Sequence, residues 1–193
     1  MKKVGLTGGM GSGKSVVSHF LEIRGFPVYD SDWRAKQLMQ NDQSLRESLV
    51  TEFGSSIYIN DRLNRQYLSS LVFDKPDRLN TLTHLVHPAV KTDFLIWADR
   101  QHSPMVFLES AILFESAFSL LMDKVMIVTA PLELRISRII QRDGVNKEDV
   151  LQRLKNQWSD EKKVSMADYV IINDDTRSII EQVAKVIEEL SIE

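Results

Sequence analysis

The chain has 193 residues, of which 43% are hydrophobic and 26% are charged, and its formal net charge is −3. This length suits one compact domain that carries insertions, and the composition excludes a mainly disordered chain. The weak negative charge provides no basic region for duplex DNA or an anionic membrane, and no apolar run reaches the roughly 20 residues of a membrane helix.

The sequence contains no cysteine, which excludes disulfides, zinc–thiolate sites and thiol nucleophiles. The amino terminus reaches Gly5 after the single apolar residue Val4, so it does not form the apolar segment of a signal peptide. We therefore expect a cytoplasmic protein, a monomer or weak oligomer, with no nucleic-acid partner and no membrane partner.

Five short apolar runs, rich in Val, Ile, Leu and aromatic residues, predict strands. They span residues 3–7, 26–29, 105–108, 125–129 and 169–172. The stretches between them include segments with the apolar spacing of amphipathic helices, such as Val16 to Leu21 and Ile179 to Leu190. Strands that alternate with helices predict an α/β fold in which helices flank a five-stranded parallel sheet.

Two segments depart from this alternation. Residues 32–102 contain the helical stretches Trp33–Gln40, Gln43–Glu52 and Pro88–Arg100 but no central strand, and residues 133–164 break at Asp143-Gly144. We expect one domain whose core consists of residues 1–31, 103–132 and 165–193, with these two segments as specialised insertions.

Residues 8–15 read GGMGSGKS, which fits the phosphate-binding pattern G-x-x-x-x-G-K-[ST]. Glycines let such a loop turn its N–H groups around a phosphate, Lys14 would add positive charge, and the Ser15 hydroxyl can bind magnesium. The alternative is a glycine-rich turn without a ligand. Because the loop joins a predicted strand to a predicted helix, the sequence favours a P-loop NTPase fold that uses ATP and Mg²⁺. The predicted nucleotide contacts are Gly9, Gly11, Ser12, Gly13, Lys14, Ser15 and Val16.

Asn146 to Asp149 spell N-K-x-D, a string that GTPases use to recognise guanine. Here it follows Asp143-Gly144 rather than a buried strand, and the chain contains no D-x-x-G. Asn146 with Asp149 three positions later is typical of the start of a helix. We therefore favour helix capping over guanine binding.

Two carboxylates, Asp30 and Asp32, follow the second predicted strand. The carboxyl ends of parallel strands form the ligand-binding edge of an open sheet, where an aspartate can accept a proton from an acceptor hydroxyl. The alternative role is capping of a helix that starts at Trp33. We favour the catalytic base for Asp32 and leave both roles open for Asp30.

Glu109 ends the third predicted strand and is a candidate metal ligand, directly or through water, although a solvated carboxylate is nearly as plausible. Arg135, Arg138 and Arg142 recur at helical spacings and predict one cationic face that neutralises transferring phosphates. An exposed, salt-bridged helix is the alternative, least easily dismissed for Arg135.

His84 and His87 lie three residues apart, but no further ligands converge with them, so we reject a zinc site there. Pro88 disfavours helical backbone at the residue before it, which predicts an element boundary at His87.

Several motifs in this chain together resemble those of the dephospho-CoA kinase family. They are VGLTGGMGSGKS from Val4, DSD at Asp30–Asp32, His87-Pro88, LFE at Leu113–Glu115, RIIQRDGV from Arg138, Gln157, and ADYVIIN ending at Asn173. They cover nearly the whole chain in the family's order. The combination of the glycine loop with D-x-D at this distance is far more specific than the loop alone.

The resemblance implies ATP-dependent phosphorylation of the ribose 3′-hydroxyl of dephospho-CoA. By similarity, Asp32 is the general base, Lys14 the phosphate-binding lysine, and Arg138 and Arg142 are lid arginines. Residues 32–102 would then hold the acceptor, and residues 133–164 would form the lid.

The chain departs from the family pattern at several positions. Glu109 and Ala111 stand where the family commonly has Asp and Pro, Lys36 stands where Arg is common, and Asp174 and Asp175 follow Asn173 where Gly is common. Two alternatives remain open at this stage: another small P-loop kinase that acts on a nucleoside or nucleotide, and a nucleotide-binding regulator that has lost catalysis.

Overall fold

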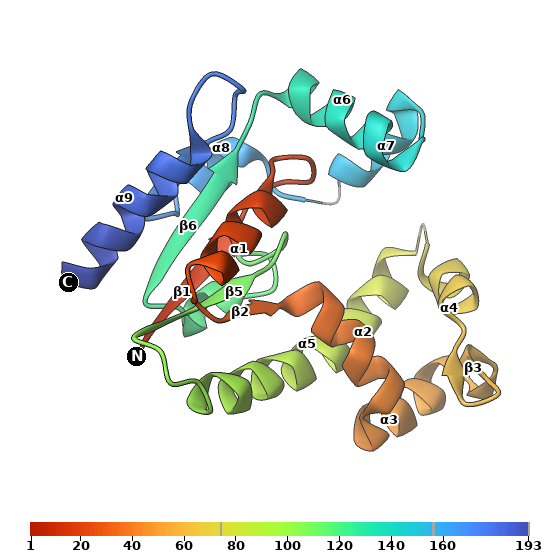
Figure 1. Ribbon diagram of the computed structural model, residues 1–193. Helices are drawn as coiled ribbons and strands as arrows, with labels where there is room; N and C mark the ends of the chain where they lie inside the picture. The colour runs from red at the N-terminus through yellow and green to blue at the C-terminus, as the bar shows by residue number, and fades with distance from the viewer. Residues whose placement is uncertain (74, 156, 193) are drawn as a thin grey trace. The chain divides into compact units, whose positions relative to one another are not determined.

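The computed structural model describes residues 1–73, 75–155 and 157–192 and divides into two compact units (Figure 1). The sheet unit comprises residues 1–29 and the chain from Gln101 onward, and the helical unit comprises Asp30–Arg100. Within the described ranges, no helix has the length and apolar character needed to cross a membrane. The ranges expected for the core, the insertion and the lid also include residues 193, 74 and 156, which lie outside the described residues.

The sheet unit is built on five strands in the order β2-β5-β1-β6-β7. Their bounds are β1 Lys2–Thr7, β2 Val28–Asp30, β5 Met105–Glu109, β6 Lys124–Thr129 and β7 Tyr169–Ile172. β1 pairs in parallel with β5 and β6, and β6 pairs in parallel with β7. All five predicted strands are present, and the predicted α/β class with a five-stranded parallel sheet is confirmed.

Helices connect these strands and follow the last of them. They are α1 Lys14–Ile23, the short 3₁₀ helix η2 Phe118–Leu121, α6 Leu132–Asp143, α7 Lys147–Leu154, α8 Asp160–Val164 and α9 Ile179–Ile192. α6, α7 and α8 lie within or overlap the segment 133–164 that the sequence set apart, whereas α1 and α9 pack on the central sheet.

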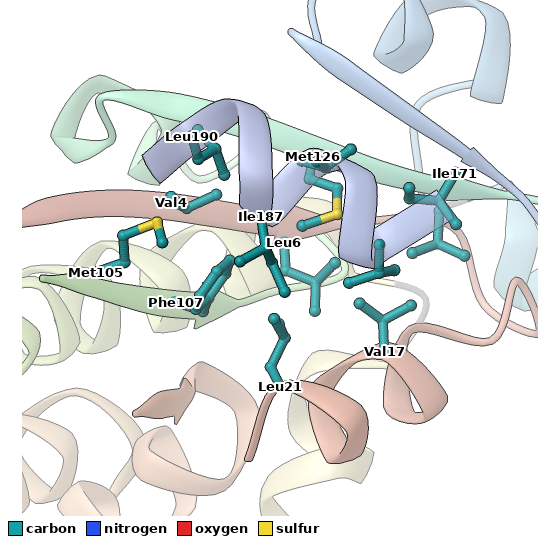
Figure 2. Packing of buried hydrophobic residues seen from close by; sticks show 13 residues of the cluster. Val4, Leu6, Val17, Leu21, Met105, Phe107, Met126, Ile171, Ile187 and Leu190 are labelled. Atoms are coloured by element: carbon teal, nitrogen blue, oxygen red, sulfur yellow. The ribbon is translucent and has the colours of Figure 1, made fainter. Parts of the chain in front are cut away.

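The main core lies between the sheet and these two helices (Figure 2). Val17 and Leu21 of α1 and Ile187 of α9 pack with side chains of the central strands, such as the fully buried Leu6 and Phe107. Burying one side chain of this size stabilises the folded state by roughly 1.5–3 kcal/mol. This packing holds the carboxyl end of β1 and the start of α1, which the glycine loop joins.

The helical unit contains most of the first specialised segment, residues 32–102. Its elements are α2 Ser31–Asn41, α3 Gln43–Phe53, η1 Ser55–Ile57, β3 Tyr58–Ile59, β4 Arg62–Leu63, α4 Arg65–Val72 and α5 Pro76–Asp99. β3 and β4 form a separate antiparallel pair. Their turn residues Asn60 and Asp61 have φ angles of 50° and 63°, as a tight hairpin requires.

Helix α5 corrects one prediction. It runs through Pro88 without a break, so the predicted element boundary at His87 is wrong, and the predicted helix Pro88–Arg100 is the second half of a longer one. Proline removes one N–H donor and disfavours helical backbone before it. Val86, Val90, Phe94 and Ala98 are buried along this helix, and that packing outweighs the local preference.

Candidate active site

The glycine loop connects the buried strand β1 to helix α1, as the motif requires. Gly11 and Gly13 have φ angles of +78° and +98°, which side-chain-bearing residues rarely adopt. A Cβ at Gly11 would lie 2.7 Å from the carbonyl oxygen of Arg135, and one at Gly13 would lie 2.2 Å from Nδ2 of Asn173. Both glycines are therefore required by backbone conformation and by close neighbours.

The loop presents groups that suit an anion. The first N–H groups of a helix have no carbonyl partner within it, and the helix dipole adds partial positive charge at the same end. The Ser12 hydroxyl is fully buried, and it has no hydrogen-bond partner among the described residues. Ser15 and Val16 lie exposed in the first turn of α1, and Lys14 is half-buried at its first position. These features fit the phosphates of a nucleotide.

Asn173, which follows β7, holds the loop from the side. Its Nδ2 donates to the main-chain oxygen of Ser12 at 2.8 Å. Arg138 links the same residue to the loop, because its Nη2 donates to Oδ1 of Asn173 at 3.1 Å and its Nη1 lies 3.5 Å from the oxygen of Gly11. Arg138 also pairs with Asp175 at 2.5 Å. The structure thus brings Arg138 to the glycine loop.

The three arginines of α6 do not form the single cationic face that their spacing predicts. Arg142 is exposed and donates from Nε to Asp143 at 2.7 Å. This hydrogen bond raises the pKa of Arg142 above its ordinary value and lowers the pKa of the Asp143 carboxyl. Arg135 is 6% exposed and pairs with Asp160 at 2.6 Å, so the exposed-helix interpretation fails for Arg135 and describes Arg142.

Glu109 ends β5 beside the end of β1, because Leu6 and Glu109 are register partners. Its carboxylate is half-buried and accepts a short hydrogen bond from the Ser18 hydroxyl of α1. No group of three or more acidic, histidine or cysteine side chains in the described part of the chain is arranged to hold a metal ion. Magnesium that arrives with a nucleotide takes one or two carboxylates besides phosphates and water. The Ser15 hydroxyl and the Glu109 carboxylate are oxygen donors of the kind it prefers, and their role as its ligands stays a prediction.

The aspartates after β2 have different surroundings. Asp30 caps α2, because its Oδ1 accepts the N–H of Trp33 at 2.9 Å. The helix begins at Ser31, two residues before the predicted start, and Asp32 lies exposed in its first turn. The structure therefore assigns Asp30 the capping role that the sequence left open.

Asn146 also caps a helix. Its Oδ1 accepts the N–H of Asp149 at 2.8 Å, at the start of α7. This geometry agrees with the capping interpretation of the N-K-x-D string and gives no support to a guanine site.

Sequence reasoning assigned no loop-holding role to four residues of this region. Arg135 and Gln157 bind the main chain of Met10, Asn173 binds that of Ser12, and Asp160 pairs with Arg135. Asn173 follows a strand of the parallel sheet, so the same rule that selected Glu109 could have selected it. The ion pair of Arg135 with Asp160 has no comparable signal, because the two residues are 25 positions apart.

Comparisons with known proteins agree with the motifs. Residues 2–178 match the family model described as dephospho-CoA kinase. A dephospho-CoA kinase of Bacteroides fragilis is 39% identical over 186 residues, which cover 96% of this chain and 91% of that protein. One of Porphyromonas gingivalis is 40% identical over 189 residues, which cover 97% and 94%.

Solved structures show the same relationship. The crystal structure of TT1252 from Thermus thermophilus superposes with a TM-score of 0.88 at 34% identity, covering 98% of this chain and 97% of that one. Dephospho-CoA kinase from Campylobacter jejuni gives 0.71 at 27% identity, with coverage of 99% and 98%. Shikimate kinase from Acinetobacter baumannii shares the fold alone, with a TM-score of 0.54, 18% identity, and coverage of 100% and 93%.

The family expected from the sequence is confirmed by a model match and by relatives that span nearly the full chain. The relatives named dephospho-CoA kinase agree with the predicted enzyme class. This chain belongs to the dephospho-CoA kinase family.

Proposed function

We propose that this protein transfers the γ-phosphoryl group of ATP to the ribose 3′-hydroxyl of dephospho-CoA, which yields CoA and ADP. The observation that carries the proposal is the glycine loop between β1 and α1, held by Asn173 and Arg138, in a chain matched by the family model over residues 2–178. Family membership favours this reaction over transfer to another nucleoside or nucleotide. It also gives no reason to favour a regulator without catalysis.

The glycine loop would bind the phosphates of ATP. We assign this role to Gly9, Gly11, Ser12, Gly13, Lys14, Ser15 and Val16. Loop N–H groups and the start of α1 meet the phosphate oxygens, while Lys14 compensates charge near the γ-phosphate. Ser15 and Glu109 would hold Mg²⁺, which when bound neutralises charge on the β- and γ-phosphates.

Asp32 is the proposed general base. It accepts the proton of the 3′-hydroxyl as that oxygen bonds to the γ-phosphorus and the bond to the β-phosphate oxygen breaks, so ADP leaves with the electron pair. Arg138 and Arg142 stabilise the negative charge on the transferring group. Arg142 must exchange its partner Asp143 for phosphate to do so, which is consistent with a lid formed by residues 133–164.

The remaining assignments concern partners and location. Residues 32–102 would bind the acceptor, which makes the small molecule dephospho-CoA the expected partner besides ATP. We propose a monomer or weak oligomer without a nucleic-acid partner, because the net charge of −3 offers no electrostatic attraction to nucleic acid. A cytoplasmic location suits a cysteine-free enzyme that uses ATP.

Acceptor-dependent ADP release tests the proposal. The purified protein is incubated with ATP and magnesium, and dephospho-CoA is compared with adenosine, with AMP and with no acceptor. We expect rapid ADP release only with dephospho-CoA. Faster turnover with another acceptor would replace the proposed substrate, and equal rates with and without acceptors would remove the kinase assignment.

A further inference from the structure

Met10, in the middle of the glycine loop, is held by side chains that come from much later in the chain. Its main-chain N–H donates to Oε1 of Gln157 at 3.1 Å. Its carbonyl oxygen accepts from Nε of Arg135 at 2.9 Å. Both polar main-chain atoms of one loop residue are thus fixed by Arg135 and Gln157, which belong to the proposed lid.

The side chain of Arg135 is buried against the backbone of the glycine loop rather than exposed to solvent. It is 6% exposed, and a Cβ at Gly9 would lie 2.1 Å from its Nη2, so the guanidinium packs directly on the loop. Its Nη1 pairs with Asp160 at 2.6 Å, and the same carboxylate oxygen accepts from the Thr129 hydroxyl at 3.1 Å. The charge of Arg135 is therefore compensated within the protein.

The Met10 side chain supplies a third attachment. It packs against the apolar cluster formed by Ile136, Ile139 and Val150, which joins α6 to α7. Met10 therefore attaches the loop to these two helices through both its main chain and its side chain. Arg138, one turn further along α6, reaches the loop at Gly11 and contacts Asn173 and Asp175 instead.

We propose that Arg135, supported by Asp160 and together with Gln157, is a positioning residue that holds residues 9–11 in the conformation that binds the phosphates of ATP. The inference rests on the proposed function of the glycine loop. It does not make Arg135 a catalytic residue, because the ion pair with Asp160 occupies its charge. A loop without these contacts must be ordered during nucleotide binding, and that ordering weakens affinity.

The test compares Gln157→Leu, Arg135→Lys and Arg135→Gln with the wild type. Gln157→Leu removes one neutral hydrogen bond, so we expect the Kd for ADP and the KM for ATP to rise about 3- to 10-fold. Arg135→Gln should raise them further, and Arg135→Lys should recover part of the loss because it can keep the ion pair with Asp160. The KM for dephospho-CoA should change by less than about twofold in Gln157→Leu.

Two further measurements separate positioning from a general loss of structure. Amide hydrogen exchange at residues 9–13 should be faster in Gln157→Leu without nucleotide, while the exchange of β5 and β6 is unchanged. Arg153→Gln is the matched control, because Arg153 is an exposed residue of α7 that pairs with Asp143. We expect it to leave ADP affinity unchanged.

Calorimetric titration with ADP needs no acceptor, so it tests this inference even if dephospho-CoA is not the substrate. Wild-type ADP binding without phosphorylation of dephospho-CoA would remove the proposed function and leave the role of Arg135 open to the same titration. ADP affinity and loop exchange that match the wild type in both Gln157→Leu and Arg135→Lys would overturn the positioning role.

Discussion

Asp30 and Asp32 are separated by one residue and have different surroundings. Asp30 is occupied as a cap, since its Oδ1 accepts the N–H of Trp33, whereas Asp32 is exposed in the first turn of α2. Both positions were visible in the sequence as carboxylates after a strand. Which of the two aspartates caps the helix depends on where the helix begins, and local sequence signals place helix ends only approximately.

Replacing the proposed base tests its role directly. Asp32→Asn keeps the size of the side chain and removes its basicity, so we expect kcat to fall about 10²- to 10⁴-fold. The Kd for ATP should remain within about twofold of the wild type, because the loop binds the phosphates. Steady-state kinetics and nucleotide titration measure the two quantities.

Asp30→Asn is the matched control, because asparagine caps helices as well as aspartate does. It should retain most of the wild-type kcat. If Asp32→Asn lost ATP affinity and turnover to the same extent, its assignment as the base would be wrong.

Sequence reasoning located the glycine loop and the capping role of Asn146, because each depends on neighbours within a few positions. It did not predict that Arg135 is buried while Arg142 is exposed, although both belong to one helix. That difference is set by Met10 and Asp160, which come from other parts of the chain. Contacts of this kind require the tertiary fold.

At the scale of elements, a buried ion pair attaches α8 to the segment that follows β5. Lys163 is fully buried and donates to Glu115 Oε1 at 2.8 Å and to the carbonyl oxygen of Ala111 at 2.8 Å. Glu115 Oε1 also accepts the N–H of Trp158 at 2.9 Å. The pair therefore fixes the end of the proposed lid segment to the sheet unit.

Breaking this pair should be costly. Lys163→Met leaves the Glu115 carboxylate without its cation, so we expect a loss of about 3–5 kcal/mol in the free energy of unfolding. Combining Lys163→Met with Glu115→Gln should recover part of that loss, because no unpaired charge remains. Urea unfolding of both variants measures the difference. A double variant no more stable than the single one would show that charge burial is not the cause.

Helix α5 offers a test of pH dependence. The pKa of His87 lies below its ordinary value, first because of burial and then because of the charges of Lys91 and His84. The unfolded chain therefore binds a proton at higher pH than the folded helical unit does. Neutral His87 therefore stabilises the folded unit at a pH above the pKa that His87 has in the unfolded chain. This stability is lost as the pH falls toward the lower pKa that His87 has in the folded protein.

The comparison is between the wild type and His87→Gln. Going from about pH 7.5 to about pH 5.5, the wild type should lose roughly 1–3 °C more in Tm than the variant, a modest effect because the side chain is partly solvated. Thermal unfolding followed by circular dichroism measures both. A Tm that falls equally in the two proteins would mean that His87 carries no such linkage.

At the scale of the whole molecule, the strands and the α/β class followed from the sequence because buried parallel strands are continuous apolar runs. The order β2-β5-β1-β6-β7 did not, since strand order depends on how long connections pack. The long helix α5 was also missed in part, because Pro88 is a strong local signal that packing overrides. The chain departs from the usual family pattern at Glu109 and Asp175, yet the family model matches residues 2–178.

Identification of the product tests the proposed phosphorylation of dephospho-CoA most directly. The protein is incubated with ATP, magnesium and dephospho-CoA, and the product is analysed by mass spectrometry and phosphorus NMR, with Lys14→Ala as the control. We predict a gain of one phosphoryl group on the ribose 3′-oxygen, formed in equal amount with ADP and greatly reduced by Lys14→Ala. Unchanged dephospho-CoA, or a phosphate at another position, would contradict the proposed reaction.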